Sequence, residues 1–455
     1  MPTPSLVNIP FTTKQSLLFS QIPESGAGDF EVSRTTVPAN RSTRINSSGL
    51  IETIADNVPR LDYPLGGAVN GCPALLVEPA ATNLALQSQD FSTTWAPQNL
   101  ATVNTNTAVS PTGAVNADTI NLAAVADSRI TQVITVANST TYTISCFYKN
   151  IALTAGELFN MRFNNFGSAP NDFIATATID LAAGTASYTV SGTPTTGYSG
   201  TATGRIENYG NGWYRVSLTF TVGSAGGNLG GFQPAQVGPA TARSFYAWGA
   251  QLEVGTSTTS ASSVSSYIPT TTVQVARGAD VIRQTNIASL IGQSEGTVYF
   301  EVEVTNEARN RWFFTLDSAS NSFIQAWISP SRTINVQIQN NASVVMTQLT
   351  SSVLTVGYHK VAFAYNTATN GCEMFIDGVQ NPVASRTVTG AGLPAFNNFT
   401  FGSYLSTQND TLKGHVRAGS LYPDRLSNLR LEFLTAPVTY TTYAQMANAL
   451  SYILP

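Results

Sequence analysis

Four carboxylates could perform acid–base chemistry on a polysaccharide if the fold paired two of them across one cleft: Glu157, Glu207, Asp317 and Glu373. Glycoside hydrolysis needs two such groups on either side of the scissile bond. Sequence spacing pairs none of the four, and no Gly-x-Ser-x-Gly, His-Glu-x-x-His or phosphate-binding glycine loop occurs. The sequence therefore predicts no catalytic residues and a protein that is not an enzyme. A polysaccharide depolymerase stays open as the alternative.

Metal ligands are equally sparse. The only histidines are His359 and His415, and neither has a Cys or a second His at metal-binding spacing. Asp377 and Asp410 carry oxygens that calcium could use, but no dense Asp/Asn loop surrounds them. The three cysteines, Cys72, Cys146 and Cys372, lie far apart and are expected to be small buried hydrophobic residues. We therefore predict no metal site and no cofactor, with calcium unsupported.

An unusual concentration of charge lies between residues 34 and 95. From its charged residues we single out Arg44, Glu52, Arg60, Asp62 and Glu78. Only 11% of the chain is charged, and charges in such a chain tend to be paired. One interpretation is that these residues form ion pairs that fasten the N-terminal segment to the module that follows. The other is that they form an interface to another subunit.

Tryptophans are candidates for stacking on sugar rings, and we single out Trp213, Trp312 and Trp327. The competing interpretation for each is a place in a β-sandwich core, which large aromatic side chains dominate. Trp213 lies opposite the apolar face that begins with Tyr214 and Val216. One face of that strand must therefore meet solvent, an interface or a second packed layer.

The elements that would position these residues are strands. Polar and apolar residues alternate over residues 141–149, 213–222 and 297–305, as in half-buried antiparallel strands. Asn211-Gly212, Asn370-Gly371 and Asp377-Gly378 predict tight hairpin turns, because both central positions of such turns need positive φ. Helical spacing is clearest at residues 441–454.

These patterns predict an all-β fold with two antiparallel β-sandwich or jelly-roll domains. We expect an extended N-terminal arm over residues 1–65, which the resemblances described below imply is an attachment arm, and a first sandwich over 66–270. A linker over 271–294 and a second sandwich over 295–437 follow. A short C-terminal helical segment occupies 438–455.

Composition restricts the partners. A net charge of −4 over 455 residues disfavours nucleic acid, which needs a basic patch. The chain contains no run of about 18 apolar residues, so we expect no membrane insertion. No basic segment followed by an apolar one occurs after Met1, so we expect no signal peptide.

The first sandwich resembles a carbohydrate-binding-like β-sandwich family found in phage tail-fibre and head-fibre proteins. The resemblance is carried by Arg44-Ile-Asn46, Gly49-Leu-Ile-Glu52, Pro59-Arg60-Leu-Asp62-Tyr63, Leu75-Leu-Val-Glu78-Pro79, Thr82-Asn83-Leu84, Asp90-Phe91, Trp95, Gly212-Trp213-Tyr214-Arg215, Tyr246-Ala-Trp248-Gly249-Ala-Gln251-Leu-Glu253 and Ser266-Tyr267-Ile-Pro269-Thr270. It covers roughly residues 30 to 283. One position departs from the pattern: the family has an arginine where this chain has Ala81, so a charge contact made there is absent or replaced.

The second sandwich resembles laminin-G and concanavalin-like modules. The residues are Gly357-Tyr-His359-Lys-Val-Ala-Phe-Ala-Tyr365, Met374-Phe-Ile-Asp377-Gly378 and Leu426-Ser427-Asn428. The match is to a pattern and not to a site. Modules of this kind bind glycans, in some cases through calcium, or serve assembly alone.

Together the resemblances imply a structural virion protein of a tailed phage, a fibre or capsid-decoration subunit on head or tail. It would be made in the host cytoplasm, anchor to capsid, neck or tail subunits through its N-terminal arm, self-associate as a homotrimer and adhere to host-surface glycans. Two alternatives stay open: a tailspike-type depolymerase, and an assembly protein that binds no glycan.

Overall fold

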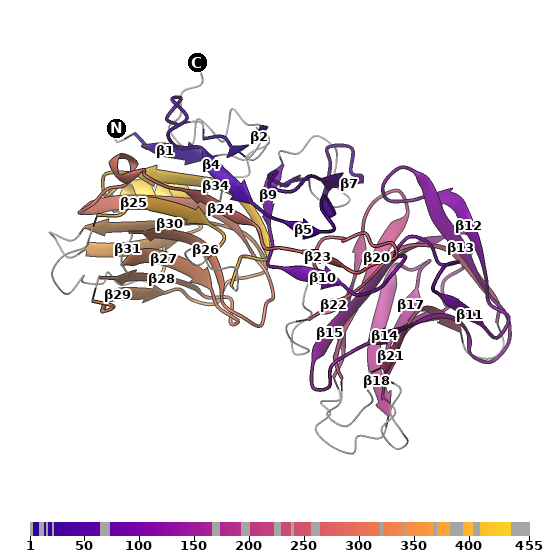
Figure 1. The fold of residues 1–455 in the computed structure, drawn as a ribbon. Helices are drawn as coiled ribbons and strands as arrows, with labels where there is room; N and C mark the ends of the chain where they lie inside the picture. Colours follow the sequence, from indigo (N-terminus) through magenta and orange to yellow (C-terminus); the bar gives the residue numbers. More distant parts are fainter. Residues whose placement is uncertain are drawn as a thin grey trace.

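The computed structural model describes residues 3–8, 13–14, 17–20, 22–63, 73–165, 173–192, 201–222, 229–237, 241–255, 264–318, 322–340, 342–366, 371–382, 395–403 and 410–437. Its strands gather into two bodies, each built from two large antiparallel sheets (Figure 1). The predicted all-β, two-sandwich fold class is confirmed.

The first module is the body that Figure 1 draws mainly in purple and magenta. Its sheet I has the order β11 (Ala96–Gln98), β14 (Ser128–Thr135), β21 (Leu229–Val237), β16 (Phe159–Asn165), β17 (Phe173–Asp180) and β18 (Thr185–Gly192). Its sheet II has the order β12 (Thr102–Val109), β13 (Val115–Leu122), β22 (Arg243–Val254), β15 (Thr141–Asn150), β20 (Trp213–Thr221) and β19 (Thr203–Asn208).

Alternation along the strands builds the core of this module. Ile144 of β15 and Val216 of β20 are fully buried from sheet II, and Met161 and Phe163 of β16 meet them from sheet I. Both strands of sheet II were expected from their period of two. The prediction that the cysteines are buried is confirmed for Cys146, which lies in this core. Cys372 is buried in the other module, and Cys72 lies outside the described residues.

The second module has the same construction. Sheet III has the order β2 (Thr13–Lys14), β3 (Leu17–Leu18), β4 (Phe30–Ser33), β24 (Val281–Gln284), β33 (Asn398–Phe401), β26 (Arg311–Asp317), β27 (Phe323–Ile328), β28 (Ile334–Gln339) and β29 (Val345–Thr350). Sheet IV has the order β32 (Val379–Gln380), β31 (Gly371–Ile376), β30 (Gly357–Asn366), β25 (Glu295–Val304), β34 (Gly414–Tyr422), β9 (Ala74–Val77) and β8 (Leu61–Asp62), with β1 (Leu6–Asn8) also paired to β34.

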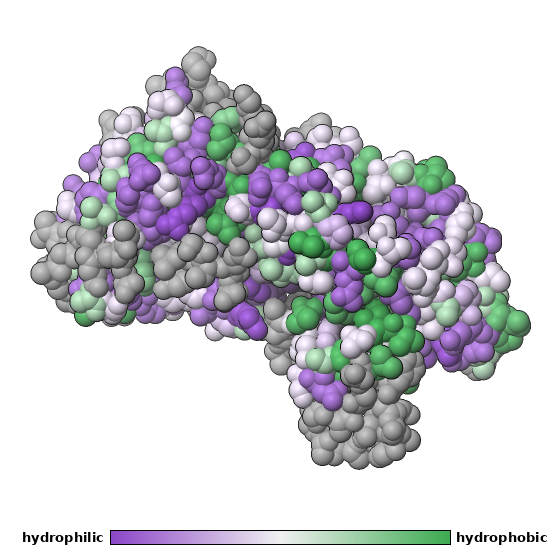
Figure 2. Space-filling model, viewed as in Figure 1, coloured by the Kyte–Doolittle hydropathy of each residue, from purple (hydrophilic) through white to green (hydrophobic). Residues whose placement is uncertain are grey.

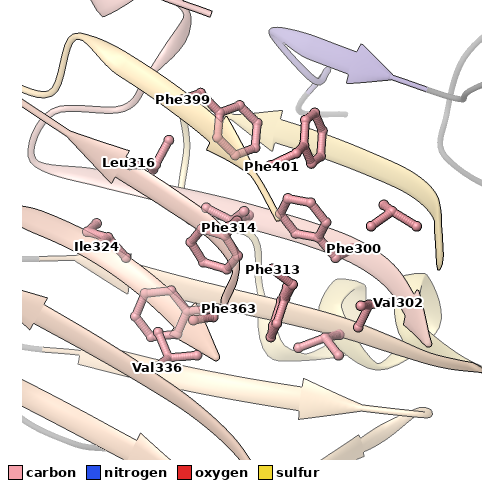
Figure 3. Close-up of a cluster of buried hydrophobic side chains, with 14 of the residues drawn as sticks. Phe300, Val302, Phe313, Phe314, Leu316, Ile324, Val336, Phe363, Phe399 and Phe401 are labelled. Carbon is pink, nitrogen blue, oxygen red and sulfur yellow. The ribbon is translucent and has the colours of Figure 1, made fainter. Parts of the chain in front are cut away.

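Phenylalanine rings fill the space between sheets III and IV (Figure 3). Phe300 of β25 stacks on Phe314 of β26 with ring centroids 5.1 Å apart, and Phe399 and Phe401 of β33 close over them. Large aromatic side chains bury much apolar area each, so this cluster contributes strongly to the stability of the module.

The N-terminal segment belongs to this second sandwich. β1 adds to sheet IV and β3 and β4 extend sheet III, although residues 1–65 were predicted as an arm. The ring of Phe30 is fully buried 4.4 Å from that of Phe401. Core burial and sheet hydrogen bonds therefore hold the described part of residues 1–33 on the module.

Smaller elements join the two sandwiches. β6 (Ser42–Ile45) and β7 (Ile51–Ile54) form a hairpin, and β23 (Val275–Arg277) lies between β10 (Ala81–Asn83) and β5 (Thr36–Val37). The predicted linker 271–294 thus contributes strands β23 and β24, followed by a 3-10 turn at Ala288–Leu290. The segments of the junction lie between the two bodies (Figure 1).

Local turn and helix signals had mixed outcomes. Asn211 and Gly212 have φ of 52° and 80°, and Asp377 and Gly378 have 51° and 82°, as the hairpin prediction required. Asn370 and the helix predicted over residues 441–454 lie outside the described residues.

The helix that the structure describes is α1 (Asn428–Thr435), which Ser427 caps by accepting a hydrogen bond from the Arg430 amide. It packs Leu431 and Leu434 on the outer face of sheet IV. No helix in the described ranges has the length and apolar character needed to cross a membrane.

Candidate functional site

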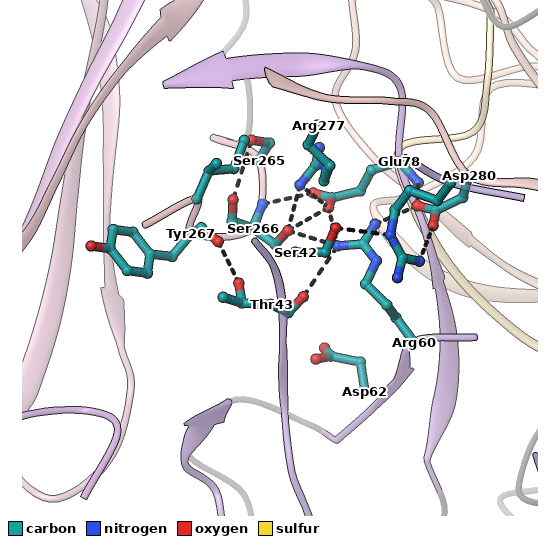
Figure 4. A network of polar contacts seen from close by, with 12 residues as sticks. Ser42, Thr43, Arg60, Asp62, Glu78, Ser265, Ser266, Tyr267, Arg277 and Asp280 are labelled. Carbon is teal, nitrogen blue, oxygen red and sulfur yellow. Dashed lines mark hydrogen bonds and ion pairs between the residues drawn. The ribbon is translucent and has the colours of Figure 1, made fainter. Parts of the chain in front are cut away.

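Arg60 and Glu78 lie in a buried ion network where the modules meet (Figure 4). Nη1 of Arg60 donates to Glu78 Oε2 at 2.7 Å, and its Nη2 pairs with Asp280. Arg34 reaches Asp280 Oδ1 at 2.8 Å, and Arg277 reaches Glu78 Oε2 at 2.8 Å. The arginine side chains are 0% exposed and the carboxylates at most 5%.

The charges set the protonation states of the carboxylates. Burial alone would raise the pKa of Glu78, but Arg277 and Arg60 outweigh it and lower that pKa well below its ordinary value. Burial opposes ionisation of Asp280 in the same way, and Arg60 and Arg34 lower its pKa too. Both carboxylates therefore stay ionised at neutral pH, and the ion pairs of the network stay intact.

Additional hydrogen bonds connect the network to the end of the first module. Ser266 Oγ accepts from Arg60 Nη1 at 2.7 Å and from Arg277 Nη1 at 2.6 Å, while its amide donates to Glu78 Oε1 at 2.7 Å. Two further donors from Arg34 go to the carbonyls of Ala55 and Val58. The network thus ties together the N-terminal segment, both sandwiches and the connector between them.

The arrangement supports the fastening interpretation for Arg60 and Glu78, since their partners lie in the same chain. Sequence reasoning missed Arg34, Arg277 and Asp280. The signal was an Arg-Gly-Ala-Asp run, residues 277–280, within a predicted linker of a chain poor in charge. Arg277 also stands directly opposite Ala81, so an arginine is supplied to Glu78 from the neighbouring strand.

The remaining charged candidates lie on the hairpin and beside it. Arg44 Nε pairs with Glu52 Oε1 at 2.8 Å across β6 and β7, with side chains 23% and 36% exposed. Asp62 accepts from the Ile45 amide at 2.5 Å and so fixes the hairpin against β8. Arg44 and Glu52 are therefore the candidates that an external partner could reach.

A cavity of about 420 Å³ opens at this junction. Its walls come from the hairpin, from sheet II of the first module and from sheet IV of the second. The charged and aromatic lining residues include Arg44, Asp62, Glu78, Arg205, Glu207, Tyr209, Glu303, Tyr358, His415 and Arg417. The volume is within the range of small-molecule sites, which favour domain interfaces.

His415 is held between two carboxylates in this cavity. Its Nε2 lies 2.9 Å from Asp62 Oδ2, and its Nδ1 lies 2.7 Å from Glu303 Oε2. Burial alone would lower the pKa of His415, but hydrogen bonds to both carboxylates raise it well above its ordinary value of 6.5. Burial likewise opposes ionisation of Glu303, yet His415 lowers its pKa. His415 is therefore a cation held between two carboxylates at neutral pH.

Trp213 is in a second packed layer, one of the three environments left open for its face. It is 1% exposed and lies with Phe147, Trp248, Tyr267 and the hairpin residue Ile51 on the outer side of sheet II. Its indole N–H donates to the Val109 carbonyl at 3.1 Å. The ring has no open face for a sugar in this arrangement.

Trp312 and Trp327, in contrast, form a stacked pair. They are directly opposite on β26 and β27, with ring centroids 5.7 Å apart and planes inclined by 26°. Ile324, Ala326 and Ile328 of β27 point into the core, so Trp327 lies on the outer face of sheet III. Both indoles are half-buried.

Amide side chains continue from this pair across the same face. Gln325, Gln337 and Gln348 are directly opposite one another on β27, β28 and β29. Gln325 accepts from the Trp312 indole N–H at 3.0 Å and donates to Gln337 Oε1 at 2.8 Å. The result is an aromatic platform beside a row of hydrogen-bonding groups.

The carboxylates considered for catalysis are kept apart. Glu207, Asp317 and Glu373 lie on sheets II, III and IV, and Glu157 precedes a strand of sheet I. Each is paired with an arginine: Arg205, Arg283, Arg425 and Arg243 respectively. Among the described residues no group of three or more His, Cys, Asp or Glu could hold a metal, and Asp377 accepts from His359 Nδ1 at 2.5 Å.

Asp280→Asn should destabilise the protein by about 3–5 kcal/mol, because it leaves Arg34 and Arg60 buried with an incomplete set of counter-charges. Chemical denaturation at pH 7 measures this. The matched control is Glu52→Gln, which breaks a partly exposed pair and should cost at most about 1 kcal/mol. Equal effects of the two substitutions would contradict the fastening role of the network.

His415 should titrate well above pH 6.5 in NMR spectra of the imidazole protons. A raised folded-state pKa means that its contribution to stability is complete below the ordinary value and is lost as pH rises through the folded value. Asp62→Asn should lower the pKa of His415 and leave that of His359 unchanged. Since the chain has only these two histidines, the second is an internal control.

Comparisons with known proteins give structural likenesses only. No family model matches the chain, and no curated protein does either. Among solved structures, the CBM40 module of the Ruminococcus gnavus IT-sialidase bound to α2,3-sialyllactose is 14% identical, with a TM-score of 0.27 over 33% of this chain and 86% of that one.

Two further structures are similar at the same level. A heptameric SAP-like pentraxin from Limulus polyphemus is 12% identical, with a TM-score of 0.26 over 31% of this chain and 70% of its own. A leech intramolecular trans-sialidase is 17% identical, with a TM-score of 0.27, and the match spans 33% of this chain and 24% of the enzyme. These likenesses extend over about a third of the chain, so what it binds has to follow from its own residues.

Proposed function

We propose that this chain is a non-enzymatic, glycan-binding structural subunit of a tailed-phage particle, with a glycan site on the outer face of sheet III. The observation that carries the glycan site is the stacked Trp312–Trp327 pair beside the row of glutamines on neighbouring strands. This is the combination that a sugar requires, because a pyranose has an apolar face and a rim of hydroxyl groups.

The two parts of the site have different tasks. Indole rings offer large, rigid apolar surfaces at little cost in conformational entropy. Gln325 is 4% exposed and is committed to Trp312 and Gln337, so it holds the row in place. The amides of Gln337 and Gln348 offer both donors and acceptors, which suits hydroxyl groups that can do either. Packing on the indole rings would thus supply affinity, and the glutamines would fix the orientation of the sugar. Several such sites on a trimer would add through avidity.

Membership of a phage particle is supported by the motif resemblance and by the surface. The face in Figure 2 is a mixture of hydrophilic and intermediate residues, with hydrophobic ones in small groups, most of them on the first module. Because the N-terminal strands are built into the second sandwich, attachment would use the folded junction around Arg44 and Glu52. The neighbouring cavity could receive a segment of another virion protein.

A depolymerase is less well supported than adhesion. A glycosidase needs a carboxyl group with a raised pKa as its general acid. Burial raises the pKa of Asp317, but this carboxylate is paired with Arg283 on sheet III. In the junction cavity, Glu207 and Glu303 are both lining residues, but His415 lowers the pKa of Glu303. Release of oligosaccharides from purified host capsule or lipopolysaccharide would establish the enzymatic alternative.

Trp327→Ala should weaken glycan binding by roughly 30-fold, or about 2 kcal/mol, the size of a central aromatic contact. A glycan array followed by titration of the bound glycan measures this. The control is Phe433→Ala. It removes a ring that is 60% exposed on α1, the helix that packs on sheet IV. Binding by wild type that survives in Trp327→Ala would exclude this face, and silence of the wild type on the array would favour an assembly protein.

An electron cryomicroscopy map of the intact particle should contain the chain in groups of three, in contact with capsid, neck or tail subunits through the junction. Deleting residues 1–65 is not a clean test, because it removes Arg34, Arg60 and strands of both sheets of the second module. Absence of the chain from purified particles by mass spectrometry would refute the virion assignment.

A further inference from the structure

The outer face of sheet I carries a second concentration of polar side chains, on the other module from the tryptophan pair. Met161 and Phe163 of β16 point into the core, so Arg162 and Asn164 lie on the outer face. Gln233 of β21 and Thr176 of β17 stand directly opposite Arg162 on either side. Arg162 is therefore near the middle of the sheet.

The neighbouring strand adds to the same face. Ile130 of β14 is in the core, which places Arg129 and Thr131 outward. Arg129 is opposite Gln236, and Gln236 in turn is opposite Asn160 of β16. The side chains of Asn160 and Gln236 are joined by a hydrogen bond of 2.8 Å. The face thus consists of arginines, amides and threonine hydroxyls in register.

Many polar atoms of this face have no partner. In the part of the chain that the structure describes, Arg162 makes no hydrogen bond and no ion pair, and its Nε is buried. Within the described ranges, the buried oxygens Gln233 Oε1, Asn164 Oδ1 and Thr131 Oγ1 also lack a partner, and so does Arg129 Nε. Gln233 is only 2% exposed.

Such atoms are costly. Each buried group left unsatisfied costs about 1–3 kcal/mol, and folded proteins keep few of them. Several on adjacent strands of one sheet face indicate that partners come from outside the chain. Donors and acceptors are interleaved here, so the fitting partner is rich in hydroxyl groups.

Charge defines the partner further. Arg129 is paired with Asp127, whereas no carboxylate among the described residues pairs with Arg162. The pKa of Arg162 is lowered mainly by burial and to a smaller extent by the nearby charge of Arg129. A negative group beside Arg162 would therefore be stabilised by its guanidinium. A guanidinium donates two parallel hydrogen bonds to a carboxylate. A net charge of −4 argues against a nucleic-acid backbone as the source of that negative charge.

We propose that the outer face of sheet I is a second binding site, which takes an acidic glycan with a uronic-acid carboxylate on Arg162 and ring hydroxyls on Gln233, Asn164 and Thr131. The site does not depend on the tryptophan pair, and either site can exist without the other. On a multimeric particle it would add a charge-selective contact to the stacking contact of the second module.

The test is titration calorimetry of the full chain with oligogalacturonate and with oligomannuronate, each beside its carboxyl-reduced neutral counterpart. Wild type should bind at least one acidic oligomer, more weakly as salt rises, and bind the neutral counterparts at least tenfold more weakly. Arg162→Ala should abolish binding, and Arg162→Lys should restore only part of it, because an ammonium lacks the planar fork.

The controls separate this site from other effects. Arg309→Ala, an exposed arginine of the second module, and Trp327→Ala should both leave uronate binding unchanged. Arg162→Ala should keep or raise the melting temperature, because it removes an unpaired buried group; if it fails to fold, Asn164→Ala takes its place. Equal binding of neutral oligomers, full binding by Arg162→Ala, or no uronate binding by wild type would each overturn the proposal, and ordered water would then be the partner of these atoms.

Discussion

The pairing of three buried arginines with Glu78 and Asp280 is the constraint on which the arrangement of this protein depends. A buried charge without its partner costs several kcal/mol, so no contributing segment can leave the network without a large penalty. Arg34 and Arg60 come from the N-terminal segment, Glu78 directly follows β9 of sheet IV in the second module, and Asp280 comes from the connector. The N-terminal segment, the hairpin and both sandwiches are thereby fixed to one another at a single point.

This junction has consequences for binding. The two faces that we assign to glycans are on different modules, one on sheet I and one on sheet III. A rigid connection presents them in a constant relation, which reduces the entropy lost when both engage one surface. Strands β1, β3 and β4 complete the sheets of the second module, so the attachment that we propose would use the junction and not a free arm.

Arginine has two different tasks in this chain, and the contacts distinguish them. Arg60 is fully buried, with carboxylates on two sides and a serine hydroxyl on its Nη1. Arg162 lies near the middle of the outer face of sheet I with its Nε buried, and no described residue gives it a carboxylate or hydroxyl partner. A paired buried charge stabilises one arrangement of segments, whereas an unpaired one is a cost that folding alone does not explain. Arg60 and Arg277 each also have a buried Nε without a described partner, but carboxylates hold their terminal nitrogens. A guanidinium held by carboxylates therefore marks the scaffold here, and one that pairs with no described carboxylate marks the candidate for binding.

The sequence by itself determined the features that are local. Strands β15, β20 and β25 follow from alternation of side chains along the chain, and the turns at Asn211-Gly212 and Asp377-Gly378 follow from residues that tolerate positive φ. Scarcity of charge also indicated that charged candidates such as Arg60 and Glu78 form ion pairs within the chain. These conclusions need only neighbouring residues, which is why a single sequence could supply them.

Only the tertiary structure decided which distant residues meet. Arg60 and Asp280 are separated by 220 positions, and no local pattern links them. Trp213 is buried because a hairpin from residues 42–54 covers its face, while Trp312 and Trp327 stack because of the register of β26 against β27. Burial and register depend on long-range pairing, whose entropic cost is offset only when the whole fold forms. Local sequence therefore specified the elements, and long-range packing specified the candidate sites.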